Sequence, residues 1–132
     1  MKQAKFRQVI ILSAELSELN DSNNLHRSDL LESCLNSLNI TFNESEGYYK
    51  GRKEVSFVTL PKNDDELQAI IDLAFINFSQ ESIIKQDTDG KTFIIYNDGD
   101  CQEIGRLKRV ETHQIKEYDG YTRLNGVYYA AS

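Results

Sequence analysis

The feature that most constrains the fold is a run of four apolar residues, Val9 to Leu12, near the start of the chain. No polar residue alternates with them, and most of them are β-branched. Such a run is typical of a central strand buried on both faces, whereas an edge strand alternates polar and apolar residues. We therefore predict a sheet built around this strand, which should end at Ser13 and Ala14.

Two later segments have the apolar spacing of helices. The first is predicted over residues 25–38, where the apolar face consists of Leu30, Leu31, Cys34, Leu35 and Leu38. The second begins after Asn63, which is followed three residues later by Glu66 in an Asn-led relative of the capping box. Its apolar face consists of Leu67, Ile70, Ile71, Ala74, Phe75 and Phe78.

The remaining patterns indicate strands. NITF at 39–42 is predicted to be a strand, NESEGYYKGRKE a polar, aromatic loop, and EVSFVTL a second firm strand ended by Pro61. DTDG predicts a hairpin turn between strands at 82–85 and 91–97, and Asn125-Gly126 predicts another between YTRL and VYYAA. Cys101 is expected to lie in a polar loop.

The order of these elements is β-α-β-β-α-β, followed by more strands. Right-handed crossovers then favour an α+β fold, a ferredoxin-like sheet with two helices on one face, extended by C-terminal β-hairpin strands. A length of 132 residues suits one domain, and no segment rich in proline, glycine or serine divides it. We predict a single domain over residues 1–132.

Charge and composition exclude several classes of function. The formal charge of −6 argues against a partner bound through its phosphate backbone, so no nucleic acid is expected. The apolar runs are too short for a membrane span, and no cleavage site follows the basic N-terminal segment. Cys34 and Cys101 do not make a disulfide framework. We expect a cytosolic protein with reduced thiols.

Common sequence motifs for cofactor binding, metal binding and serine catalysis do not occur. The sequence contains no GxGxxG, GxxxxGK[ST], HExxH or GxSxG. His26 and His113 are too few for a histidine-rich metal site, and neither has a cysteine at a spacing typical of zinc. We therefore expect no metal and no cofactor.

Several polar residues lie where a ligand site could form, each with a simpler alternative. Ser13 follows the buried strand, but its hydroxyl could simply end that strand. Asn24 and Arg27 lie three apart near a helix start, but could be a cap and a solvated guanidinium. Glu54 could form a strand-end ion pair with Arg52 or Lys53.

Three further candidates come from the loop and the second helix. Tyr48 and Tyr49 could pack over the sheet or stack on a cationic or planar ligand. Gln80 could bind a ligand or form hydrogen bonds at the helix exit.

The segment SAELSELNDSNNLHRSDLLESCLNSL resembles the N-terminal part of the phage S-adenosylmethionine lyases, formerly called hydrolases. The matching positions are Ser13, Ala14, Ser17, Leu19, Asp21, Asn24, Arg27, Ser33 and Leu35. The similarity continues through Tyr49, Glu54 and Gln80 to the C-terminal YDGYTRLNGVYY, which covers nearly the whole chain.

The resemblance implies a phage enzyme in the host cytosol that converts S-adenosylmethionine into 5′-methylthioadenosine and homoserine lactone. It also implies a homotrimer with active sites between subunits and a role in antirestriction, by removing the cofactor of restriction-modification systems. The substrate carries both a nucleophile, its carboxylate, and a leaving group, its sulfonium. A protein without a catalytic motif therefore suffices if it enforces the geometry of attack.

The resemblance leads to specific hypotheses for these residues. Glu54 would hold the cationic side of the substrate, and Tyr49 would position it, with Tyr48 as a further contact. Ser13 and the adjacent backbone at Ala14 would contact adenosine. Arg27 would pair with the substrate carboxylate or support a subunit contact; we favour the second, because a clamped carboxylate is a weaker nucleophile.

Asn24 and Gln80 are further substrate-binding candidates, and Glu111 would provide a second acidic contact. Three alternatives remain open. The chain could be a non-catalytic ligand-binding module, since fold alone does not give function. It could be a hydrolase in which water attacks, giving homoserine directly. It could also be an acidic mimic of DNA, although 15 basic residues interrupt its negative charge.

Overall fold

The computed structural model describes residues 7–49 and 51–132. The strands are β1 (Val9–Ser13), β2 (Thr41–Tyr49), β3 (Arg52–Leu60), β4 (Ser82–Gln86), β5 (Lys91–Tyr96), β6 (Cys101–Val110), β7 (Gly120–Leu124) and β8 (Val127–Ala131). The helices are α1 (Asp21–Ser37) and α2 (Asp64–Asp72), with a π-helical turn η1 (Leu73–Asn77) and a 3-10 helix η2 (Thr112–Glu117).

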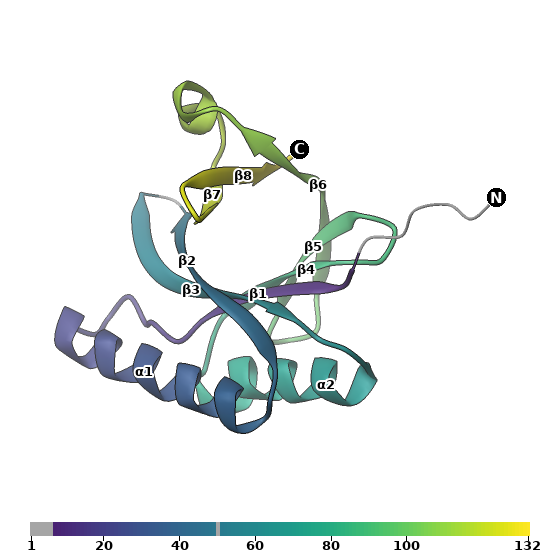
Figure 1. Ribbon diagram of the computed structural model, residues 1–132. Coiled ribbons are helices and arrows are strands. Elements are labelled where there is room, and N and C mark those ends of the chain that lie inside the picture. The colour runs from purple at the N-terminus through teal and green to yellow at the C-terminus, as the bar shows by residue number, and fades with distance from the viewer. Residues whose placement is uncertain (1–6, 50) are drawn as a thin grey trace.

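The strands form a closed antiparallel barrel in the order β1-β3-β2-β7-β8-β6-β5-β4 (Figure 1). β1 lies between β3 and β4, so that Ile10 is opposite Thr59 on one side and Lys85 on the other. The barrel closes through β7, which pairs with the outer edge of β2, and through β6, which joins β5 to β8.

The predicted ferredoxin-like sheet with two helices on one face is wrong, because the sheet closes into a barrel. The order β-α-β-β-α-β occurs in the first part of the chain. The C-terminal strands do not merely extend one edge, however; they connect β2 to β4 around the other side of the barrel. Closure pairs backbone groups that would remain exposed at the edges of an open sheet.

The strand predictions have mixed outcomes. Both hairpins are confirmed, at 82–96 and at 120–131. The segment predicted as a polar loop is wrong, because β2 continues to Tyr49. The loop predicted around Cys101 is also wrong, because β6 begins there. Both strands have many exposed or half-buried positions, so neither has the apolar pattern by which a buried strand is recognised.

The hydrophobic core lies between the helices and the outer face of the barrel. Ile10, Leu12 and Phe57 from β1 and β3 are buried with Leu31 from α1 and Ile70 from α2. Figure 1 shows both helices along the same side of the barrel, beneath β1 and β3. Because alternate residues of a strand face opposite ways, Ile11 and Ser13 face the barrel interior, and β1 is buried on both faces as predicted.

Asparagine side chains set the start of both helices. Asn20 accepts a hydrogen bond of 2.8 Å from the backbone N–H of Asn23, so α1 begins at Asp21, four residues before the predicted start. Asn63 caps α2 in the same way through Glu66 at 2.8 Å, as predicted. Among the described residues, no helix has the length and apolar composition needed to cross a membrane.

Candidate active site

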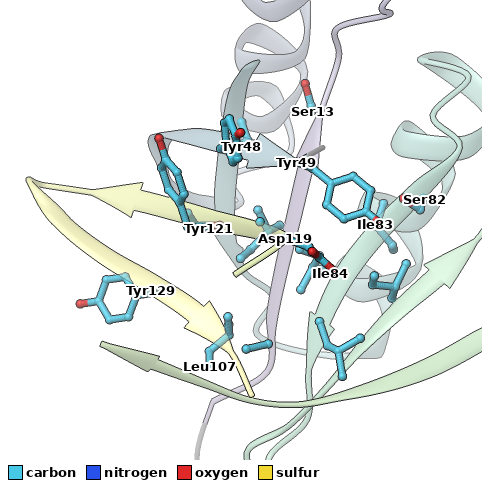
Figure 2. Close-up of a pocket in the computed structure, with 18 of the residues that line it drawn as sticks. Ser13, Tyr48, Tyr49, Ser82, Ile83, Ile84, Leu107, Asp119, Tyr121 and Tyr129 are labelled. Carbon is cyan, nitrogen blue, oxygen red and sulfur yellow. The ribbon is translucent and has the colours of Figure 1, made fainter. Parts of the chain in front are cut away.

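The barrel encloses a cavity of about 470 Å³, and Figure 2 shows residues that line it. The inward-facing positions of nearly every strand contribute to its wall. The apolar part of the lining includes Ile11, Ile84, Ile94, Ile104, Leu107 and Ala131.

The charged residues in the described part of the wall are all acidic. Glu54 contributes from β3, and Glu117 and Asp119 contribute from η2 and the segment that follows it. No Lys, Arg or His occurs among the described residues of the lining. An apolar wall with carboxylates at fixed positions favours a ligand that is both partly apolar and positively charged.

Glu54 lines this cavity and is partly exposed. Its side chain is 33% exposed, and its Oε2 accepts a hydrogen bond of 3.0 Å from Nη1 of Arg52. Burial raises the pKa of Glu54, Arg52 lowers it, and the nearby carboxylate of Glu15 raises it further. Opposite Glu54 on β2 lies Gly47, which has no side chain to cover the carboxylate.

Tyr49 reaches the cavity from the end of β2 (Figure 2). It is 50% exposed and lies opposite Gly120 on β7. A β-carbon at position 120 would lie 3.1 Å from Cδ2 of Tyr49 and 2.7 Å from the carbonyl oxygen of Tyr48. The glycine therefore makes room for the Tyr49 ring. Tyr48 also borders the cavity, and its ring stacks on that of Tyr121 at 5.0 Å between centroids.

Ser13 and Gln80 border the same cavity. The hydroxyl of Ser13 donates to the carbonyl of Val55 at 2.7 Å and accepts from the N–H of Glu15 at 3.0 Å. The buried amide of Gln80 donates to the carbonyl of Glu15 at 3.1 Å and to that of Phe78 at 3.2 Å. Both residues thus also fix the backbone where β1 ends.

The other predicted site residues do not line the cavity. Arg27 donates from Nε to the carbonyl of Ala14 at 2.6 Å and from Nη2 to the carbonyl of Phe78 at 2.5 Å. The amide of Asn24 holds the backbone of Leu16 through hydrogen bonds of 2.9 and 3.0 Å. These contacts shape the chain between β1 and α1.

Glu111 is exposed and lies at the N-terminus of η2, outside the cavity lining. It forms a capping box with Gln114. It therefore helps to fix the helix that is followed by the acidic segment of the cavity wall.

Sequence reasoning did not identify Glu117, Asp119 or Glu15 as site residues. Asp119 precedes the last predicted hairpin, but only closure of the barrel pairs that hairpin with β2, the strand next to the one that carries Glu54. Glu15 follows the Ser13-Ala14 pair that was singled out, and its carboxylate binds the backbone N–H of Val55 on the neighbouring strand. Neither position has a recognisable motif.

The sequence model of the S-adenosylmethionine lyase family matches residues 10–132. The chain belongs to this family. The match spans the whole of the described cavity lining, from Ile11 to Ala131, and confirms the resemblance drawn from the sequence. The lyase acts on S-adenosylmethionine, a sulfonium cation, which agrees with a cavity whose described charged residues are acidic. No curated protein matches the chain.

Proposed function

We propose that this lyase binds S-adenosylmethionine in the barrel cavity and cleaves it by intramolecular attack. An oxygen of the substrate carboxylate forms a bond to the γ-carbon while the bond from that carbon to sulfur breaks. The electron pair of the broken bond goes to sulfur, which becomes the neutral thioether of 5′-methylthioadenosine. The other product is L-homoserine lactone, and the protein neither gives nor takes a proton.

The observation that carries this proposal is the exclusively acidic charge of the described cavity lining. A carboxylate beside the cation holds the substrate, while the described part of the wall offers no arginine or lysine to pair with the substrate carboxylate, which therefore stays reactive. Restraint of the methionine tail supplies the rest, because an oriented internal nucleophile reaches effective molarities of about 10⁵ M or more.

In this proposal Glu54 holds the ammonium or sulfonium side, and Tyr49 places its ring or hydroxyl against the tail. Tyr48 and Gln80 complete the wall, and Ser13 contacts adenosine, while the buried Ala14, whose carbonyl is bound by Arg27, fixes the strand end beside it. Asn24 and Arg27 maintain the strand end from which those contacts are made, and Glu111 supports the acidic segment after η2.

The decisive experiment incubates the purified protein with S-adenosylmethionine and follows methylthioadenosine by chromatography. Glu54→Gln should lose most turnover, whereas the matched control Glu46→Gln should retain it, because Glu46 is paired with Lys53 outside this cavity. Intact S-adenosylmethionine after prolonged incubation would instead indicate a non-catalytic binding module. Normal turnover by Glu54→Gln would remove Glu54 from the site.

Water is the competing nucleophile, and isotope labelling separates the two reactions. In ¹⁸O-labelled water, an unlabelled lactone as first product supports cyclisation. Label incorporated during carbon–sulfur cleavage would show a hydrolase that gives homoserine directly.

The resemblance to the phage lyases supports a proposal for the wider role. We propose a single S-adenosylmethionine-degrading domain that acts in the cytosol of a phage-infected bacterium and starves restriction-modification systems of their methyl donor. We further propose a homotrimer, in which a neighbouring subunit covers the exposed parts of Glu54 and Tyr49. Analytical ultracentrifugation tests the trimer, and a monomer that retains full activity would contradict it.

A further inference from the structure

Three charged side chains form a bridge beside the cavity, and one of them, Glu54, lines it. Arg52 donates from Nη1 to Oε2 of Glu54 at 3.0 Å and from Nη2 to Oε1 of Glu15 at 3.1 Å. One guanidinium thus joins two carboxylates that come from different parts of the chain. Glu54 belongs to β3, and Glu15 belongs to the segment after β1.

The far end of this bridge is anchored in the backbone. The second oxygen of Glu15, Oε2, accepts a hydrogen bond from the N–H of Val55, and the Glu15 side chain is only 13% exposed. Its own N–H is held by Ser13, and its carbonyl by Gln80. Glu15 is therefore the most firmly held member of the three, and Arg52 extends from it toward Glu54.

The bridge also acts on the ionisation of Glu54. Burial disfavours the ionised carboxylate most, Arg52 on the same strand favours it, and Glu15 disfavours it through repulsion of like charges. Ser13 is the polar neighbour from β1, Gly47 of β2 lies opposite, and Glu117 and Asp119 border the same cavity from the η2 side. On the outer side, Glu54 and Glu15 border a second pocket whose other charged residues are Asp21, Glu44, Glu46, Lys53 and Arg123.

We propose that Arg52 and Glu15 are positioning residues: Arg52 holds the Glu54 carboxylate ionised and aimed at the cation of the substrate, and Glu15 anchors Arg52. Neither residue lines the inner cavity, so neither contacts the substrate there. This inference rests on the proposed function, because it assigns Glu54 to the substrate cation. It adds that one guanidinium and one carboxylate outside the cavity adjust the ionisation of Glu54, which burial disfavours.

The test compares Arg52→Met, Arg52→Lys and Glu15→Gln, with Glu46→Gln as the matched control. In Arg52→Met, Glu54 loses its cation, so the acid limb of the kcat/KM profile should shift to higher pH. At mildly acidic pH the loss should be about tenfold or more, the value of one charge-assisted hydrogen bond, and alkaline pH should restore part of it. Arg52→Lys keeps the charge and should rescue part of the shift.

Glu15→Gln should move the acid limb the opposite way, to lower pH, because it removes the like charge and leaves Arg52 beside Glu54. A general loss of structure does not shift two variants in opposite directions. Profiles that stay at the wild-type pH in both variants, or that shift the same way, would overturn the proposal.

An NMR titration of the Glu54 side-chain carboxyl carbon gives a readout that does not depend on activity. Its midpoint should rise in Arg52→Met and fall in Glu15→Gln, with no change in Glu46→Gln. If wild-type protein does not cleave S-adenosylmethionine, the proposed function fails, while these midpoints still decide whether the bridge controls Glu54. Unchanged midpoints alongside active wild-type enzyme refute the bridge and leave the lyase proposal intact.

Discussion

At the scale of single residues, Gly120 shows how a missing side chain shapes the site. Its neighbours on β2 are so close that any β-carbon at this position must displace Tyr48 or Tyr49. The Tyr48 contact is to backbone, which has little freedom to move within a paired strand. The space at Gly120 is therefore a requirement of the Tyr49 position.

We predict that Gly120→Ala destabilises the protein by about 1–3 kcal/mol through overpacking and also lowers turnover, because Tyr49 is displaced. Urea unfolding and the methylthioadenosine assay measure the two effects. Gly126→Ala is the control: its φ of +78° makes alanine strained, but no atom crowds the new β-carbon, so stability should fall and the rate per folded molecule should persist. Equal losses of activity in both variants would contradict this role of Gly120.

The partly buried carboxyl group of Glu54 lowers the stability of the folded state at neutral pH. Because burial raises its pKa above the ordinary value of 4.5, the native protein holds this proton more tightly than the unfolded chain does. Stability from this group is therefore greatest at low pH and falls as pH rises through the interval between the two pKa values.

It follows that Glu54→Gln should be slightly more stable than wild type at neutral pH, although it is inactive. The difference should be small, since the side chain is partly solvated and Arg52 retains Glu15 as a partner. It should vanish at pH values below the ordinary pKa of a glutamate. Thermal melts across this pH range measure the trend, and a variant that is less stable at every pH would refute it.

At the scale of elements, Arg27 joins three parts of the chain. From α1 it binds the carbonyl groups at the end of β1 and at Phe78, after η1, and its guanidinium lies 5.5 Å from the centre of the Phe78 ring. Ala14 and Phe78 are buried, so their carbonyls have little access to water.

Arg27→Met should therefore lower the free energy of unfolding by about 3 kcal/mol, because two buried carbonyls lose a charged donor. The KM of the molecules that remain folded should stay near the wild-type value. Denaturant unfolding and steady-state kinetics below the melting temperature provide the check. A large rise in KM with unchanged stability would instead assign Arg27 to the substrate.

The elements also show which parts of the fold local sequence patterns predict. β1, α2 and both hairpins have local signals, namely an apolar run, a capping asparagine and Asp-Gly or Asn-Gly turns, and all were predicted. β6 and the end of β2 have none. One of their faces borders a cavity and the other is largely exposed, so selection for burial leaves little trace in their residues.

At the scale of the whole molecule, the predicted fold differs from the structure because the sheet closes into a barrel. Ser13, Tyr49, Glu54 and Gln80 were all chosen from the first two-thirds of the chain, and the structure brings them to one cavity. The opposite wall, with Glu117 and Asp119, depends on the pairing of β2 with β7. That pairing is long-range, and no local pattern encodes it.

A net charge of −6 and an acidic cavity lining should together attract a cationic substrate over a distance. We predict that KM for S-adenosylmethionine rises with ionic strength between low and about 0.15 M salt, where the screening length falls to about 8 Å. Once the substrate is bound, kcat should change little. Initial rates at several potassium chloride concentrations measure both constants, and a KM independent of salt would contradict the effect.

Alternate side chains of β1 pack against the helices and border the cavity. The stability of the fold and the shape of the cavity therefore depend on adjacent positions of one strand. Directed evolution of this enzyme toward heat resistance would therefore often change its turnover. Selection for faster turnover would also select substitutions in the core between β1 and the helices.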